Sequence, residues 1–306
     1  MTSEPETCLS CSYNFSLADG SIWSLNATDK ASAWLHEFAG IMGLESGLDN
    51  ATHRIYFTGI KDLNSPDPPR MIREVHADPN GWQQFKNAGI YRLWRHEKLR
   101  EVHMELKVEF LEHGEIKFIN MWWALREVFQ HVLAAGGTPM HAALAEIHGK
   151  GVLIAGPGDT GKSTCCHRLP DYWHGLCDDQ VLVVLNKNSG YRVHPLPTWS
   201  DHFGKELIKS WKVERAVPLS AIFFLEQSDR DEAMALKKQD QAILMVFEAA
   251  KEVWKSVWER VEVTEKIEQS SALFHNAAKM AGVIPAYRLR VTLHGEFWKE
   301  MERVLF

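Results

Sequence analysis

The stretch 156–163 has the residue types and the spacing of a phosphate-binding loop. It reads Gly-Pro-Gly-Asp-Thr-Gly-Lys-Ser, which fits the pattern G-x-x-x-x-G-K-S. Glycines let a backbone wrap closely around an anion, and successive amide N–H groups then point at the phosphates. Lys162 has the length to reach the β- and γ-phosphates of a nucleotide, and the Ser163 hydroxyl can bind Mg²⁺. We therefore predict a site for ATP or another nucleoside triphosphate, with Mg²⁺, made by Gly156, Pro157, Gly158, Asp159, Thr160, Gly161, Lys162, Ser163 and Thr164.

The residues on either side of the loop fit the order that this motif requires. An apolar run rich in β-formers, 151–155, precedes the loop, and 164–169 can begin a helix. The alternative is a Gly-rich turn that matches the pattern by chance, and the strand–loop–helix order disfavours it. Asp159 is unusual, because it places a carboxylate inside an anion-binding loop.

Two further features have residue types that phosphoryl transfer needs. The adjacent carboxylates Asp178 and Asp179 lead directly into an apolar strand, and such a carboxylate can hold Mg²⁺ or accept a proton. Their alternative role is a helix-to-strand turn, which Asp favours. His141 begins the strand predicted to pair with 151–155, so it can lie at the edge of the site. The chain has 15 His, and a core or surface role for His141 stays open.

Together, these features resemble the catalytic core of HPr kinase/phosphorylase over residues 138–185. That family has a His at the start of a strand, a glycine-rich approach to the phosphate loop, and a pair of Asp after the helix. The matching positions are His141, 149–154, the loop ending in Lys162-Ser163, and 177–179. The resemblance implies a mixed sheet like that of phosphoenolpyruvate carboxykinase. The segment 192–199 and parts of 273–298 look similar to HPr-kinase-like proteins of peptide-modifying gene cassettes, including the SynChlorMet cassettes.

The resemblance also implies a role for each residue in the transfer of a γ-phosphoryl group. Lys162 and the loop bind the phosphates, Ser163 binds Mg²⁺, and Asp178 is the general base toward a hydroxyl acceptor. Asp179 supports that base or binds the metal, and His141 positions the acceptor or orients the carboxylate. The family's signature Glu and Arg-Gly pair are absent after the Asp pair. Arg192 stands in that region, either as a phosphate contact or as a surface residue.

Three functions follow as hypotheses. The first is an ATP-dependent kinase that phosphorylates Ser or another hydroxyl on a peptide or protein. The second is a small-molecule kinase, for example one acting on free serine. The third is a nucleotide-binding regulatory module of a peptide-modification cassette that no longer transfers phosphate. A carboxykinase is disfavoured, because no set of Arg residues for oxaloacetate is evident.

The fold class expected around these residues is α/β (α+β). A strand-rich N-terminal domain of unknown role spans 1–115, and an HPr kinase-like catalytic domain spans 116–306. In the first domain, residues 1–24 are polar and mixed, and the beginning of this segment reads as loosely ordered. Further along, the patterns predict a helix over 29–42 with Asp29 as its cap, a Pro-rich loop over 64–70, and strands over 53–60, 89–96, 101–110 and 116–119.

In the second domain, a helix over 121–135 is predicted between a cap at Asn120 and the pair Gly136-Gly137. The segments 139–147 and 151–155 should form a hairpin. Further strands are predicted over 176–185, 191–195, 219–225 and 285–293. One or two helices are predicted over 239–260, an amphipathic segment over 270–281, and a last helix over 295–305.

Composition restricts the classes of protein. The net charge of −6 gives no electrostatic case for nucleic acid, and no apolar run approaches membrane-spanning length. The acidic N-terminus lacks a signal peptide's apolar core, so a cytoplasmic protein is expected. Of five Cys, Cys8 and Cys11 read as free thiols rather than a metal site, because no second C-x-x-C exists. A homo-oligomer is compatible with the resemblance, since HPr kinases are hexamers.

Overall fold

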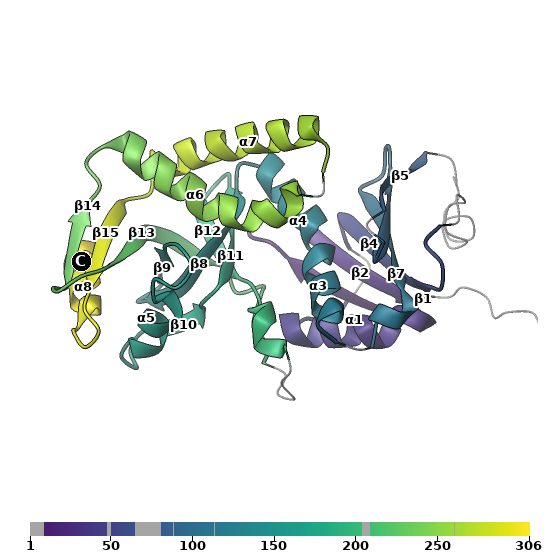
Figure 1. Ribbon diagram of the computed structural model, residues 1–306, viewed down its shortest axis with the longest axis horizontal. Coiled ribbons are helices and arrows are strands. Elements are labelled where there is room, and N and C mark those ends of the chain that lie inside the picture. Colours follow the sequence, from purple (N-terminus) through teal and green to yellow (C-terminus); the bar gives the residue numbers. More distant parts are fainter. Residues whose placement is uncertain are drawn as a thin grey trace, which may run out of the picture. The chain divides into compact units, whose positions relative to one another are not determined.

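The computed structural model describes residues 9–47, 50–64, 81–87, 89–112, 114–203, 209–259 and 261–306. The chain is a mixed α/β protein with two mixed β-sheets and few helices (Figure 1). Its contacts define two units, 1–125 with 199–212 and 126–198 with 213–306. The sequence-based boundary lies after residue 115, whereas these contacts put the division after Leu125 and assign 199–212 to the N-terminal unit.

The N-terminal unit is built on a sheet with the strand order β3-β1-β2-β4-β7-β6-β5. The β2–β4 and β4–β7 pairs are parallel, and the other pairs are antiparallel. Helix α1 packs on β1, β2 and β4. The elements are β1 (Leu9–Ser16), β2 (Ile22–Thr28), α1 (Asp29–Met42), β3 (Glu45–Ser46), β4 (His53–Ile60), β5 (Trp82–Asn87), β6 (Tyr91–His96), β7 (Glu101–Lys107), η1 (Val108–Phe110), α3 (Gly114–Ala124) and η2 (Trp199–His202).

The beginning of the segment expected to be loosely ordered, 1–8, lies outside the described residues. From Leu9 onward, β1 and β2 form an antiparallel pair that the sequence analysis did not predict. Polar residues hide these strands in the sequence. Ser24 and Asn26 face the side of the sheet opposite to Leu25, yet they are buried, and the Ser12 and Ser24 hydroxyls lie 3.3 Å apart. Burial of hydrogen-bonded polar groups replaces the apolar alternation that marks an ordinary strand. Of the predicted Pro-rich loop, 65–70 lies outside the described residues.

The predicted strand over 116–119 is also wrong, because these residues lie in α3. Asn120, expected to cap the next helix, is a buried residue inside α3. The predicted helix over 121–135 is instead two helices, α3 and α4 (Arg126–Ala134), which part at Leu125. Met121, Trp123 and Ala124 are buried on α3. The run 116–124 is apolar apart from Lys117 and Asn120, and a mainly apolar run has no period that separates a strand from a buried helix.

The C-terminal unit holds the second sheet, with the path β10-β8-β11-β12-β13-β15-β14 and with β9 paired to both β13 and β8. The β13–β9 and β13–β15 pairs are parallel, so the sheet is mixed. Helix α6 packs on β8 and α7 (Figure 1). The elements are β8 (Thr138–Ile147), β9 (Lys150–Ala155), α5 (Lys162–Arg168), β10 (His174–Cys177), β11 (Gln180–Asn186), β12 (Gly190–Pro195), β13 (Val217–Gln227), β14 (Glu232–Ala235), α6 (Gln239–Trp258), α7 (Val263–Ala281), β15 (Ala286–Val291) and α8 (Phe297–Leu305).

The predicted hairpin is confirmed, because β8 and β9 pair antiparallel from Ala142–Ala155 to Ile147–Lys150. The turn residues His148 and Gly149 have φ values of 50° and 76°. Positive φ at both central residues is the backbone of a two-residue hairpin turn that matches the twist of the strands. The hairpin therefore fixes the end of β9, which leads directly into the loop 156–163.

The strand predicted over 176–185 is interrupted. β10 ends at Cys177 and β11 begins at Gln180, with Asp178 and Asp179 between them. Both strands pair with the same edge of β8, through Cys177–Leu144 and Gln180–His141. The two carboxylates thus occupy a break across which the register is kept, although the β10–β8 ladder has a bulge just before it, between Gly175 and Cys177.

Apolar side chains hold this unit together. Ile154 of β9 and Phe223 of β13 are fully buried in one core cluster with residues of α5 and α8. Trp254 anchors α6: its side chain is fully buried, and its indole N–H lies 3.3 Å from the Thr138 hydroxyl of β8. In the part of the chain that the structure describes, no helix has both the length and the hydropathy for crossing a membrane.

Candidate functional site

Strand register alone brings three sequence-predicted features together. His141 on β8 pairs with Gln180, the residue directly after Asp179. The next residue, Ala142, pairs with Ala155, the last residue before the loop. The central strand β8 thus places His141 between the carboxylate pair on one edge and the start of the loop on the other.

Lys162 lies inside the loop. Its side chain is buried, and its ammonium donates to the main-chain oxygens of Gly156 at 2.9 Å and Pro157 at 2.8 Å. Burial lowers the pKa of Lys162, while the carboxylates of Asp179, Asp159 and then Glu252 act to raise it. A buried ammonium close to several carboxylates gives the loop a fixed positive charge with which to bind phosphate.

The loop backbone explains Asp159. This residue has a φ of 59°, in the left-handed region, where Asp is among the few non-glycine residues that fit without large strain. Gly161 follows with a φ of 98°. The Thr160 hydroxyl donates to the Pro157 carbonyl at 2.8 Å and closes the turn. Asp159 is therefore a turn-forming residue with an exposed side chain, and its carboxylate also acts on Lys162.

The remaining loop residues are open to solvent. Pro157, Gly158, Ser163 and Thr164 are exposed. Exposure leaves the Ser163 hydroxyl accessible to a metal ion carried by a nucleotide, as its predicted role requires.

The two adjacent carboxylates have different partners. Asp179 Oδ1 lies 3.6 Å from His141 Nε2, whereas Asp178 Oδ1 accepts a 2.8 Å hydrogen bond from the buried Thr198 hydroxyl. Burial, and then the charge of Lys162, lower the pKa of His141, against a smaller opposing effect of Glu252. His141 is thus neutral near pH 7, so the imidazole that lies beside Asp179 is uncharged. Of the pair, Asp179 is the one that faces His141 and acts on Lys162.

Arg192 is not brought to this cluster. It pairs with Val184 on β11, four residues beyond Gln180. Its guanidinium donates to the Ala216 carbonyl at 2.8 Å. That hydrogen bond gives Arg192 a role in holding the end of β12 to the segment before β13.

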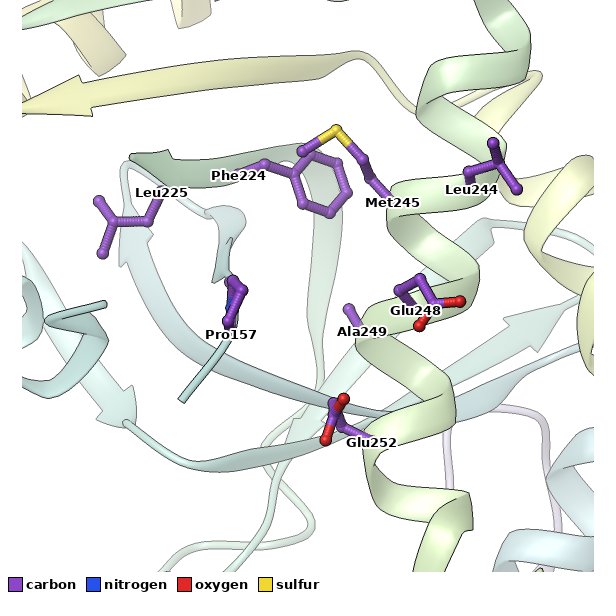
Figure 2. Close-up of a pocket in the computed structure, with 9 residues that line it drawn as sticks. Pro157, Phe224, Leu225, Leu244, Met245, Glu248, Ala249 and Glu252 are labelled. Carbon is purple, nitrogen blue, oxygen red and sulfur yellow. The ribbon is translucent and has the colours of Figure 1, made fainter. Parts of the chain in front are cut away.

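The structure adds Glu252 of α6, which the sequence analysis did not single out. Glu252 lines a cavity of about 360 Å³ together with Glu248, and its charge acts on both His141 and Lys162. Figure 2 shows this cavity between α6 on one side and Pro157 on the other. The signal in the sequence is the i, i+4 spacing of two Glu, which puts both on one face of a helix. The other residues that line it are Gly156, Pro157, Phe224, Leu225, Leu244, Met245 and Ala249.

The donor groups fit a metal that arrives with phosphate. Among the described residues there is no cluster of three or more His, Cys, Asp or Glu that could hold a metal ion. Mg²⁺ needs no such cage, because it usually binds one or two carboxylates, substrate phosphates and water. Ser163 and Asp179 satisfy that requirement on the protein side.

The cysteines near the loop are structural. Burial raises the pKa of Cys165 to about 11 and raises the pKa of Cys177 further. The Cys166 thiol forms no disulfide and donates to the Cys177 carbonyl at 3.8 Å. Thiols of this kind are protonated at neutral pH and poorly nucleophilic. For the pair near the N-terminus, Cys8 lies outside the described residues, and Cys11 is a free thiol.

Comparison with known proteins places this site within a family. No curated protein matches the chain. A family model described as "SynChlorMet cassette protein ScmC" matches residues 107–306. This match covers most of the chain, including β8, the loop, the Asp pair and α6, so the chain belongs to the ScmC family of SynChlorMet cassette proteins.

Proposed function

We propose that this protein is an ATP-dependent kinase that transfers a γ-phosphoryl group to a hydroxyl of a peptide or protein. One observation carries the proposal. The register of β8 places His141 between the Asp pair and the start of the loop that contains Lys162. A phosphate-binding lysine, an accessible Ser163 and a carboxylate in one place are the parts that phosphoryl transfer requires.

In the proposed reaction, the acceptor oxygen attacks the γ-phosphorus in line with the bond to the β–γ bridging oxygen. That bond breaks, ADP leaves, and the acceptor proton passes to a carboxylate of the Asp pair. Lys162 offsets the negative charge that develops on the phosphoryl oxygens. Mg²⁺ bound by Ser163 and Asp179 would neutralise the β- and γ-phosphates.

The two carboxylates have separable roles in this proposal. The resemblance to HPr kinase assigns the base to Asp178, and its hydrogen bond from Thr198 fixes the orientation of that carboxylate. Asp179 acts directly on Lys162 and lies beside His141, which suits metal binding or orientation of the acceptor. His141, as a neutral imidazole, can accept or donate a hydrogen bond at the acceptor without adding charge.

The hairpin entry into the loop supports a core like that of HPr kinase and phosphoenolpyruvate carboxykinase. β9 has an antiparallel neighbour, β8, on one edge and a parallel neighbour, β13, on the other. An ordinary P-loop ATPase sheet has parallel strands with helical crossovers. Membership in a cassette family favours a peptide or protein as the acceptor over a free metabolite.

The test is transfer of ³²P from γ-labelled ATP to a library of Ser-containing peptides. Asp178→Asn and Asp179→Asn should each lower labelling at least 100-fold, the size expected for loss of a general base or a metal ligand. Asp171→Asn, an exposed carboxylate before β10, is the matched control and should label like the wild type. Labelling that is unchanged in both site variants would rule out a kinase of this mechanism.

A further inference from the structure

The cavity along α6 adjoins the end of the loop at which a γ-phosphate would lie. Its loop residues are Gly156 and Pro157, the first two of the motif, and their oxygens accept the hydrogen bonds of Lys162. Lys162 is the residue that reaches the terminal phosphates, whereas Ser163 and α5 follow at the other end of the loop. A molecule that fills this cavity therefore approaches the phosphoryl group from the acceptor side.

The lining of the cavity defines the chemistry of its ligand. Phe224, Leu225, Leu244, Met245 and Ala249 make an apolar wall, and the only charged lining groups among the described residues are two carboxylates, Glu248 and Glu252. Figure 2 shows Phe224 and Met245 together at one end of the cavity and Glu252 at the other. Such a site suits an apolar group joined to a cation, and the two carboxylates disfavour an anion.

Glu252 links the cavity to the candidate reaction centre. It lines the cavity together with Gly156 and Pro157 of the loop, and its charge acts to raise the pKa of both Lys162 and His141. Glu252 also accepts a hydrogen bond from Lys255 at 2.6 Å, and Glu248 accepts one from Lys251 at 2.8 Å. Both are pairs three residues apart on α6 whose side chains are partly exposed, and such surface pairs contribute little free energy. A ligand cation can therefore replace either lysine at small cost.

We propose that this cavity binds the acceptor, and that the acceptor presents a bulky apolar side chain and a positively charged group beside its reactive hydroxyl. This inference rests on the proposed kinase function. The apolar side chain packs against Phe224 and Met245, and the cation pairs with Glu252 and Glu248. The volume, about 360 Å³, is at the lower end of the usual range for small-molecule sites and fits one large side chain.

A binding experiment tests the cavity without any phosphoryl transfer. Isothermal titration of the full chain would compare two probes of similar shape and opposite charge, 2-phenylethylammonium and 3-phenylpropionate. The ammonium should bind about tenfold more tightly, the size that one charge-assisted hydrogen bond gives. The double variant Glu248→Gln with Glu252→Gln should reduce that preference to less than twofold. Glu268→Gln, an exposed carboxylate of α7 outside the cavity lining, should leave it unchanged.

A variant that fills the cavity provides a second, independent measurement. Ala249→Leu adds volume directly at the wall and should weaken binding of 2-phenylethylammonium at least tenfold, with the far-UV circular dichroism unchanged. Equal affinity for the two probes in the wild type would overturn the proposal. So would full competition between adenosine and 2-phenylethylammonium, since it would show that the cavity holds the nucleobase.

Peptide labelling separates this proposal from the kinase proposal. In a degenerate library with one fixed Ser, labelling should favour peptides with Lys or Arg and a large apolar residue next to that Ser. If the ammonium binds as expected but no peptide is labelled, the cavity does bind an apolar cation, but the kinase proposal fails and with it the assignment of that ligand as a phosphoryl acceptor. If peptides are labelled without either preference, the kinase proposal holds and the cavity assignment fails.

Discussion

Replacing Lys162 with Met is the most direct perturbation of the candidate phosphate site. The substitution keeps the length of the side chain and removes its charge. The substitution removes two hydrogen bonds, to the carbonyls of Gly156 and Pro157, which is unfavourable. It also removes the desolvation cost of the buried ammonium, which is favourable. Gly156 is only partly buried and Pro157 is exposed, so water can replace the ammonium at both carbonyls. The free energy of unfolding without nucleotide should therefore change by no more than about 1 kcal/mol.

The increase in the free energy of unfolding that ATP produces should differ much more between the wild type and Lys162→Met. For the wild type at an ATP concentration 100 times its Kd, binding raises the free energy of unfolding by about 2.7 kcal/mol. This corresponds to a rise in Tm of roughly 5–10 °C for a unit of this size. Two charge-assisted hydrogen bonds to phosphate contribute about 3 kcal/mol or more, so Lys162→Met should raise the Kd at least about 100-fold. At the same ATP concentration the shift in Tm should then fall to about 1 °C.

The assay is thermal unfolding with and without Mg-ATP, followed by Trp fluorescence. Lys150→Met is the matched control, because Lys150 begins β9 at the end far from the loop. Its ammonium also donates to a main-chain oxygen, that of Leu305, at 2.7 Å. The control variant should keep the full ATP-dependent shift in Tm.

An ATP-dependent shift in Lys162→Met equal to that of the wild type would refute the reasoning. It would mean that nucleotide binds elsewhere or not through this lysine. A loss of the shift in Lys150→Met as well would point to a general effect on β9 rather than to a phosphate contact. If Mg-ATP does not raise the Tm of the wild type, the loop does not bind ATP, and the proposed kinase function is excluded.

Two further predictions concern His141 and Trp254. The pKa of His141 in the folded protein lies below the unfolded value of about 6.5. The stability that His141 contributes is therefore complete above about pH 6.5, and it is lost as the pH falls through the folded-state pKa. Between about pH 7 and 5, the unfolding free energy of His141→Gln measured in urea should therefore fall less steeply than that of the wild type, and a parallel fall would contradict this. Trp254→Ala removes a fully buried indole that anchors α6 to β8 and should cost about 3–5 kcal/mol in urea unfolding, whereas a loss below 1 kcal/mol would show that α6 repacks.

Local signals in the sequence were reliable where each strand or turn has its own pattern. The hairpin of β8 and β9 followed from two apolar runs separated by His148-Gly149, and the structure confirms it. Helix α1 followed from apolar residues at helical spacing. These patterns are local because side chains return to the same face every 2 residues in a strand and every 3.6 residues in a helix.

Secondary structure was predicted wrongly or missed where the buried residues are polar, as in β1 and β2, or mainly apolar without a clear period, as in α3. β1 and β2 were missed because Ser12, Ser24 and Asn26 satisfy one another inside the unit instead of marking a solvent face. The helix α3 was read as part strand, because its apolar residues have no clear period. In both cases partners distant in the sequence, rather than the local pattern, decide the secondary structure.

For the site, the sequence by itself determined the loop, the lysine within it and the presence of an Asp pair. These are short-range features, fixed by residue type and spacing. Only the tertiary structure decided that Asp179 faces His141 and Lys162 while Asp178 bonds to Thr198, because the two carboxylates lie in a break between strands that pair with one edge of β8. The tertiary structure also brought Glu252, about 90 residues beyond Lys162, to the loop, since the position of a helix depends on packing and not on its own sequence period.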